Sequence, residues 1–322
     1  MHKVKVGVVG VGALGRHHAR LYQECEQADL VGVYDADPDA AGRVAEEVGA
    51  QVFTECPELV NAADALSVAV PTDLHYDVVK GLLKSGKHVL VEKPITETIA
   101  QARELVRLAV ENSLVLHVGH VEKYNPVLSC LDQVPGEPRF IEAHRLAAYP
   151  PPRKGKLPRG TEVSVVLDLM IHDLDVLLHL VQSPVRSVDA VGVPVLSPTS
   201  DLANARLVFE NGCVANLTAS RVSADQLRKI RLFKPSAYLS LDYGNHKGEI
   251  AYKEGNSIVR EEVPVHSRNA LKSELEEFCS CVAQVQSGGN VPESKVSGDK
   301  GLAALELAHR VMDSINCNRL DR

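Results

Sequence analysis

The chain has 322 residues and a formal net charge of −7. This length predicts two domains. The negative charge argues against a protein that wraps nucleic acid or docks on an acidic membrane face, because both need a basic surface. Hydrophobic residues make up 45% of the chain and charged residues 24%, so it can bury the core of a globular protein.

The sequence also suggests a compartment. No stretch approaches the roughly 20 apolar residues of a membrane span, and no charged region followed by a long apolar run marks a signal peptide. The seven cysteines are odd in number and scattered along the sequence. We therefore expect a cytoplasmic protein with free thiols and no metal site.

The first 120 residues alternate short apolar runs with longer amphipathic stretches, which predicts strands alternating with helices. The expected strands are residues 4–9, 30–34, 65–70, 88–91 and 114–118, and the expected helices are 17–26, 38–48, 75–84 and 94–112. Apolar strands separated by helices indicate a parallel sheet covered on both faces.

The pattern changes after about Tyr124. A strand at 139–148 and a helix at 163–181 come first, and strands then follow one another at 185–193, 203–210, 213–221, 229–234, 238–243, 249–252 and 257–263. Asn211-Gly212 between two of these is a strong hairpin signal. With closing helices at 271–285 and 301–315, this half predicts an α+β domain with a large, open, mainly antiparallel sheet.

A glycine-rich loop, Gly10-Val11-Gly12-Ala13-Leu14-Gly15, joins the first strand to the first helix and fits G-x-G-x-x-G. Gly10 allows the tight turn, Gly12 lets a pyrophosphate approach the backbone, and Gly15 lets the helix pack closely on the strand. The amides of Ala13 and Leu14 would point at the phosphates from the helix N-terminus. The loop predicts a Rossmann domain, a doubly wound parallel sheet that binds a dinucleotide; the alternative is a structural turn without a ligand.

Asp35 ends the second expected strand, twenty residues after Gly15. An acid at this place accepts hydrogen bonds from the ribose hydroxyls and repels the 2′-phosphate of NADP. The next residues are Ala36, Asp37 and Pro38, so no arginine follows at once. NAD is therefore the expected cofactor.

Two further segments follow expected strands, Val70-Pro71-Thr72 with His75 after the strand at 65–70, and Glu92-Lys93-Pro94 after the strand at 88–91. Open α/β sheets bind ligands at the carboxyl ends of their parallel strands. Both segments are therefore candidates for the same site as the glycine loop.

Together with Gly86-Lys87-His88-Val89, these motifs resemble the glucose–fructose oxidoreductase/inositol dehydrogenase (Gfo/Idh/MocA) family. Members are NAD(P)-dependent dehydrogenases or reductases that act mostly on sugars and polyols. The resemblance implies an NAD-binding domain at 1–122 and a substrate-binding and oligomerisation domain at 123–322. It also implies that the cofactor-binding residues are Gly10, Gly12, Ala13, Leu14, Gly15, Asp35, Val70, Pro71, Thr72, His75, Glu92 and Lys93.

By the same resemblance, Lys93 lies beside both the nicotinamide and the substrate. A cation there orients the reacting hydroxyl and lowers its pKa. Pro94 would fix the turn that aims Lys93. The alternative for Lys93 is a solvated surface lysine.

Asp168 and His172 are four residues apart on a largely apolar expected helix, so they share one face. Ionisable groups on such a helix need partners and are site candidates. The alternative is a hydrogen-bonded core histidine with a structural aspartate. The family resemblance implies that His172 takes the hydroxyl proton and that Asp168 tunes it and Lys93, whereas Asp173, Asp175 and His179 are expected to be structural.

Three stretches, residues 118–126, 165–173 and 228–233, are similar to sugar-nucleotide 3-dehydrogenases, which oxidise UDP-N-acetylglucosamine at C3. A basic segment with Arg153, Lys154, Lys156 and Arg159 could meet a diphosphate; the alternative is a solvated loop. The candidate substrate contacts are Lys93, Tyr124, Asn125, Tyr149, Arg153 and His172.

The leading hypothesis is therefore an NAD-dependent dehydrogenase of a sugar nucleotide. An inositol or free-sugar dehydrogenase is the second hypothesis, and a non-catalytic NAD(H)-binding sensor is a third of another class. The exposed edges and faces of the second sheet need cover. The family usually supplies it by packing two such sheets, which implies a homodimer or homotetramer.

Overall fold

The computed structural model describes residues 3–152, 158, 160–265 and 268–318, and the chain divides into two compact units. The first contains residues 1–124 and 268–303, and the second contains residues 125–267 and 304–322. The first stretch ends close to the boundary expected at residue 122. Residues 268–303, however, belong to the first unit, whereas the sequence-based division placed them in the second domain.

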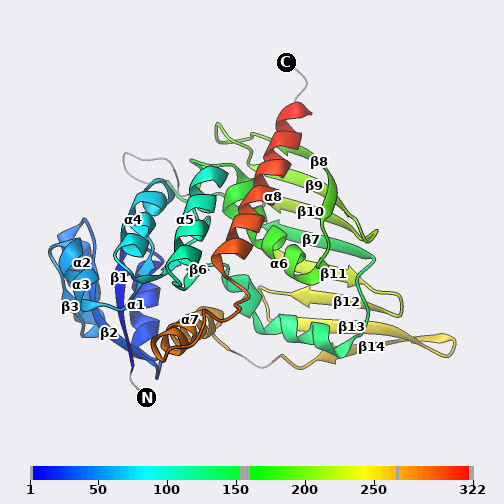
Figure 1. Ribbon diagram of the computed structural model, residues 1–322. Helices are drawn as coiled ribbons and strands as arrows, with labels where there is room; N and C mark the ends of the chain where they lie inside the picture. The colour runs from blue at the N-terminus through cyan, green and yellow to red at the C-terminus, as the bar shows by residue number, and fades with distance from the viewer. Residues whose placement is uncertain (1–2, 153–157, 159, 266–267, 319–322) are drawn as a thin grey trace. The chain divides into compact units, whose positions relative to one another are not determined.

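The first unit contains a six-stranded parallel sheet with the strand order β3-β2-β1-β4-β5-β6. Its strands are β1 (Val4–Val9), β2 (Ala28–Tyr34), β3 (Gln51–Val52), β4 (Ala65–Val68), β5 (His88–Val91) and β6 (Leu116–Val118). Its helices are α1 (Gly15–Gln23), α2 (Pro38–Val48), α3 (Cys56–Ala62), α4 (Thr72–Lys84), α5 (Ile99–Glu111) and α7 (Ala270–Gln286). Figure 1 shows α4 and α5 on one side of this sheet and α1 and α7 on the other. The predicted doubly wound sheet is confirmed.

Local signals set several helix ends in this unit. The Asp37 carboxylate caps α2, which ends at Gly49 in a left-handed conformation. Thr98 and Gln101 form a reciprocal capping box, so α5 begins at Ile99 rather than at residue 94 as expected. The short elements β3 and α3 were not expected from the sequence, because each is too short to show a periodic pattern.

Helix α7 explains why the C-terminal segment joins the first unit. Its apolar face, with Leu275, Phe278 and Val282, packs into the same core as Val4 and Val6 of β1. An amphipathic pattern shows that a helix covers an apolar surface, but it does not show which one.

The second unit contains an eight-stranded sheet with the order β14-β13-β12-β11-β7-β10-β9-β8. Only β7 and β10 pair in parallel, and the other neighbours are antiparallel, as predicted. The strands are β7 (Phe140–Leu146), β8 (Val185–Val193), β9 (Leu202–Phe209), β10 (Val214–Ser220), β11 (Leu227–Phe233), β12 (Ala237–Asp242), β13 (Lys247–Glu254) and β14 (Ser257–Val263).

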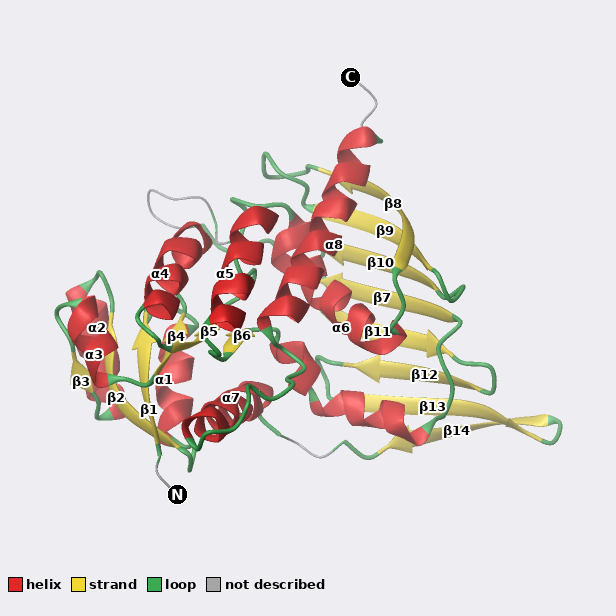
Figure 2. Cartoon of the chain, in the orientation of Figure 1, coloured by secondary structure: helices red, strands yellow, loops and turns green. Residues whose placement is uncertain are grey.

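One face of this sheet is covered by helices. Helix α6 (Ile171–Val181) and the C-terminal part of α8 (Gly298–Cys317) pack on it (Figure 2). Leu174 and Leu177 of α6 share a core with Leu207 and Leu217 of the sheet. The start of α6 is also held by a buried ion pair, in which Arg145 of β7 donates to both Asp173 oxygens at 2.9 Å.

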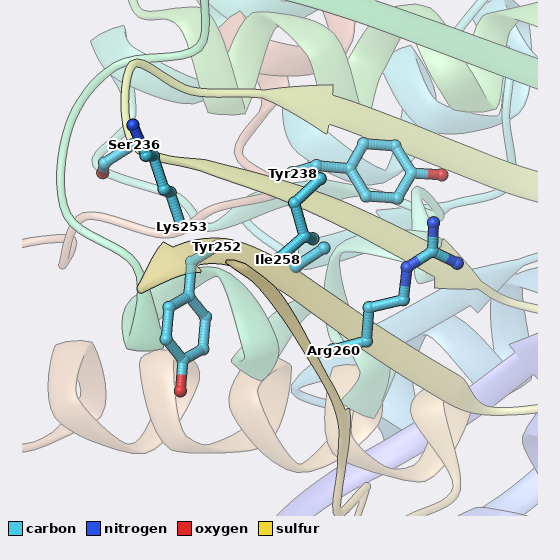
Figure 3. A pocket seen from close by; sticks show the side chains of 7 residues that line it. Ser236, Tyr238, Tyr252, Lys253, Ile258 and Arg260 are labelled. Carbon is cyan, nitrogen blue, oxygen red and sulfur yellow. The ribbon is translucent and has the colours of Figure 1, made fainter. Parts of the chain in front are cut away.

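The opposite face of the sheet carries partly exposed side chains in one register row. Phe140, Phe233 and Tyr238 are neighbours on β7, β11 and β12, with ring centroids 5.7 Å and 5.0 Å apart. The row continues through Ala251 to Arg260 on β14. An open pocket of about 420 Å³ lies at this end of the row, and Figure 3 shows Tyr238 and Arg260 beside it. This pocket contains none of the predicted site residues.

Candidate active site

The glycine loop begins directly after β1. Gly10 has a φ of +83°, and a side-chain carbon there would lie 2.8 Å from Val70 Cγ1, so only glycine fits the turn. A side-chain carbon at Gly15 would collide with the Gly10 carbonyl oxygen, which shows how closely α1 approaches the strand. At Gly12 no atom lies within 4 Å of that position. The loop therefore leaves open space for a pyrophosphate where the motif requires it.

Asp35 stands immediately after β2 and binds the glycine loop. Its Oδ2 accepts a hydrogen bond from the Val11 amide at 2.7 Å, and its Oδ1 accepts one from the Asp37 amide at 2.9 Å. The carboxylate thus lies beside the glycine turn, as the motif requires. It retains lone pairs that can accept the ribose hydroxyls of NAD.

His75 on α4 joins the segments that follow β4 and β5. Its Nδ1 lies 2.8 Å from the Pro94 carbonyl oxygen, and its Nε2 lies 3.0 Å from the Val70 carbonyl oxygen. Burial lowers the pKa of His75, although both carbonyls favour the protonated ring. The imidazole of α4 thus lies between the segments that follow β4 and β5.

Glu92 and Lys93 follow β5, and the Lys93–Pro94 peptide bond is cis. Glu92 Oε1 accepts a hydrogen bond from His18 Nε2 at 2.9 Å. Burial alone would raise the pKa of Glu92, but the His18 hydrogen bond and the nearby Lys93 charge outweigh it and lower the pKa. The carboxylate is therefore ionised at neutral pH.

Basic side chains lie where β5 and β6 end. Lys93 is partly exposed, and His120 and Lys123 after β6 are buried. Burial first, and then the charges of Lys123 and Lys93, lower the pKa of His120 to about 3. His120 is thus a neutral imidazole close to two ammonium groups.

In the second unit, Asp168 and His172 lie on one continuous helical stretch, but its first part is not α-helical. Residues Val166–Met170 form a π-helical segment, in which the Ile171 amide bonds to the Val166 carbonyl five residues earlier. The uninterrupted α-helix expected over 163–181 is therefore wrong at its start. The wider turn changes the i,i+4 relation from which we inferred that Asp168 and His172 share one helix face. Both side chains are partly exposed. Single π-helical turns occur frequently at functional sites.

A buried guanidinium holds the loops beside Asp168. Arg221 pairs with Asp201 at 2.8 Å and donates to the Gly160 and Val163 carbonyls. Gly160 packs directly on the Asp168 carboxylate, because a side-chain carbon at Gly160 would collide with Oδ2. Arg221 thus fixes the segment against which Asp168 rests.

The remaining predicted substrate residues have structural contacts. Tyr124 is nearly buried, with Lys295 Nζ 4.2 Å from its ring centroid. Asn125 Oδ1 accepts from the Val127 amide and caps the helical turn that follows. The Tyr149 hydroxyl donates to the Leu196 carbonyl at 3.4 Å. These contacts leave their roles in substrate binding as predictions, and Arg153, Lys154, Lys156 and Arg159 lie outside the described residues.

The structure thus brings the glycine loop, Asp35, His75 and Glu92-Lys93 to the carboxyl ends of one parallel sheet, and it places Asp168 and His172 in the second unit. The described residues contain no group of three or more histidine, cysteine or acidic side chains that could hold a metal ion. Within the described part of the chain, no helix is long and apolar enough to cross a membrane. Sequence reasoning did not find His18 or Arg221, because nothing in their local pattern reveals their buried partners.

This fold and these residues define a dinucleotide-binding oxidoreductase. Residues 4–120 match the family model described as oxidoreductase family, NAD-binding Rossmann fold, and residues 132–234 match the GFO/IDH/MocA C-terminal domain. The chain belongs to the GFO/IDH/MocA oxidoreductase family and is an NAD-dependent oxidoreductase that acts on CH–OH groups.

Two curated relatives show where the chain lies in this family. It is 37% identical over 290 residues to UDP-N-acetylglucosamine 3-dehydrogenase from Acidithiobacillus ferrooxidans, covering 88% of this chain and 90% of the relative. It is 24% identical over 299 residues to scyllo-inositol 2-dehydrogenase (NAD(+)) from Bacillus subtilis, covering 87% and 86%. A solved structure of UDP-N-acetylglucosamine 3-dehydrogenase from Acidithiobacillus ferrooxidans superimposes with a TM-score of 0.89 at 34% identity, covering 98% and 99% of the two chains.

Asp35→Asn tests the cofactor site. The substitution keeps the size of the side chain but removes the charge that we expect to bind the ribose hydroxyls and to repel a 2′-phosphate. We expect kcat/KM for NAD to fall by about tenfold, the effect of one charge-assisted hydrogen bond, and the NADP/NAD ratio to rise. Asp37→Asn is the matched control, because Asp37 caps α2 at 3.0 Å from the Asp39 amide. Better use of NADP than NAD by the unmodified chain would contradict this role of Asp35.

Proposed function

We propose that the chain oxidises a secondary hydroxyl of a sugar nucleotide, and that its substrate is UDP-N-acetylglucosamine, oxidised at C3. The observation that carries the proposal is the similarity to a UDP-N-acetylglucosamine 3-dehydrogenase over nearly the whole of both chains. The sequence alone favoured the same substrate on three separate stretches in both halves.

In the proposed reaction, His172 accepts the proton of the reacting hydroxyl while a hydride leaves the same carbon. NAD supplies the hydride acceptor. The Lys93 ammonium donates a hydrogen bond to the hydroxyl oxygen and stabilises the negative charge that develops on it. Asp168 sets the charge and orientation of Lys93 and His172. The products are a ketone, NADH and a proton.

Two other functions differ from this one in testable ways. An inositol or free-sugar dehydrogenase would need no nucleotide on its substrate, and the inositol relative keeps this alternative open. A non-catalytic NAD(H)-binding sensor needs the glycine loop and Asp35 but not Lys93, Asp168 and His172. The presence of all three favours a catalyst.

The substrate proposal is tested by NADH formation with UDP-N-acetylglucosamine, UDP-glucose, free N-acetylglucosamine and myo-inositol. We expect the highest kcat/KM for UDP-N-acetylglucosamine, and a product that has lost two hydrogens and reacts with hydroxylamine as a ketone. Faster oxidation of myo-inositol or of the free sugar would overturn the nucleotide assignment. NADH binding without turnover of any of these substrates would support the sensor.

The roles of Lys93 and His172 are tested by Lys93→Met and His172→Asn. Each removes a group proposed to act on the hydroxyl, so we expect kcat to fall by about 10²–10⁴-fold, and we expect His172→Asn to keep NADH binding. His179→Asn is the control, because His179 lies on the same helix and is exposed. Full turnover by either of the first two variants would refute the mechanism.

We also propose that the chain forms a homodimer or homotetramer through the face of the second sheet that carries the aromatic row. Phe233 is 38% exposed although it is large and apolar, and Ile258 on β14 is 74% exposed. Light scattering should give two or four times the mass of one chain, and Phe233→Asp should lower it. A monomer at micromolar concentration would exclude this assembly.

A further inference from the structure

A chain of buried polar side chains runs behind the strand end that carries Lys93. The Tyr22 hydroxyl lies 2.7 Å from Ser67 Oγ, which lies 3.2 Å from His18 Nδ1. His18 Nε2 lies 2.9 Å from Glu92 Oε1. Tyr22, His18 and Ser67 are fully buried, so these polar groups depend on one another for hydrogen bonds.

One arrangement of hydrogens satisfies all four groups. An ionised Glu92 can only accept, so His18 Nε2 carries the hydrogen that it donates. Burial raises the pKa of Tyr22 well above its usual value, so its hydroxyl stays protonated and can donate to Ser67. Ser67 can then donate to His18 Nδ1. In this arrangement every hydrogen in the chain has an acceptor, and the chain ends on the carboxylate.

Glu92 is the residue before Lys93, and charged or titratable groups reach it from several elements. They are His18 from α1, His75 from α4 and Lys93 itself, while His120 after β6 lies close to both Lys93 and Lys123. The Glu92 carboxylate also lies against Gly119, where a side-chain carbon would stand 3.1 Å from Oε2. Glu92 is therefore held from both sides, by His18 and by the backbone that follows β6.

We propose that His18 is a positioning residue for the reaction, which fixes the Glu92 carboxylate near the Lys93 charge and thereby holds the Lys93 side chain in its orientation. The inference rests on the proposed function for its kinetic test, because that function gives Lys93 its role. It goes beyond that function by assigning a task to α1, whose N-terminal end lies at the glycine loop. Ser67, which is hydrogen-bonded to Tyr22, holds the Nδ1 side of the His18 imidazole.

Two substitutions of His18 separate positioning from plain structural support. Glutamine can place an N–H near the position of Nε2 and so keep the bond to Glu92. Asparagine is shorter and can replace only the Nδ1 contact with Ser67. We expect His18→Gln to keep kcat within about threefold and His18→Asn to lower it by about tenfold or more, part of the contribution of one acid–base group, with little change in KM.

Glu92→Gln removes the charge of the Glu92 side chain and preserves its shape. Without the carboxylate the Lys93 ammonium loses one nearby anion, so we expect the activity to fall off at a lower pH on the alkaline side of the kcat profile. Equal kinetic losses for His18→Gln and His18→Asn, together with an unshifted pH profile for Glu92→Gln, would overturn the proposal.

A second measurement is independent of the substrate. Acetic anhydride reacts with the neutral form of an amine, and mass spectrometry of peptides reports how fast Lys93 is acetylated at a series of pH values. We expect acetylation of Lys93 to be faster at neutral pH in Glu92→Gln and His18→Asn than in His18→Gln or the unmodified chain. Unchanged labelling in all variants would overturn the role of Glu92 even if no sugar nucleotide proves to be a substrate.

His88→Leu is the control for general destabilisation. His88 is also a buried histidine of this unit, at the opposite end of β5 from Glu92, and its Nδ1 accepts from the Val115 amide at 2.9 Å. We expect both this variant and His18→Asn to lose thermal stability, but we expect His88→Leu to keep the labelling rate of Lys93. Faster Lys93 labelling in His88→Leu would show that loosening of the unit, not His18, causes the effect.

Discussion

The close contact between Gly15 and the Gly10 carbonyl sets the position of α1, and much of the first unit depends on it. With any side chain at Gly15, α1 would have to move away from the end of β1. In its present place, its N-terminus lies at the glycine loop, where backbone amides favour a pyrophosphate. One turn further along, the same helix buries His18 and Tyr22 against Ser67 of β4 and Glu92 after β5. One packing contact therefore serves both the cofactor loop and the support of Lys93.

The second unit holds its candidate residues with buried arginines. Arg145 fixes the start of α6 through Asp173, and Arg221 fixes the segment around Gly160 on which Asp168 rests. Removing one partner of a buried ion pair is costly, because the remaining charge stays buried without compensation. Such pairs confine Asp168 and the first turn of α6 to one arrangement.

The sequence predicted those features that depend on short, local patterns. The alternation of strands and helices, the glycine loop and Asp35 are local, and the structure contains them as expected. The π-helical turn at Asp168 was missed because i→i+4 and i→i+5 bonding leave almost the same apolar pattern. The placement of α7 was missed for a different reason, because an amphipathic pattern does not show which surface the apolar face of the helix packs on. The contacts of His18 and Arg221 join residues far apart in the sequence, so no local pattern could reveal them.

The Glu92 side chain is only 12% exposed, and this gives the Glu-Lys-Pro motif a physical explanation. A buried carboxylate is unfavourable unless hydrogen bonds and opposite charge compensate for the lost water. Here His18 donates the hydrogen bond and Lys93 provides the opposite charge, and together they keep the carboxylate ionised. The interaction is mutual, because an anion that is stabilised by a neighbouring ammonium stabilises that ammonium in return. Glutamate before lysine in this motif is thus explained as a counter-charge of the lysine that we propose to meet the substrate, and His18 holds this carboxylate in place.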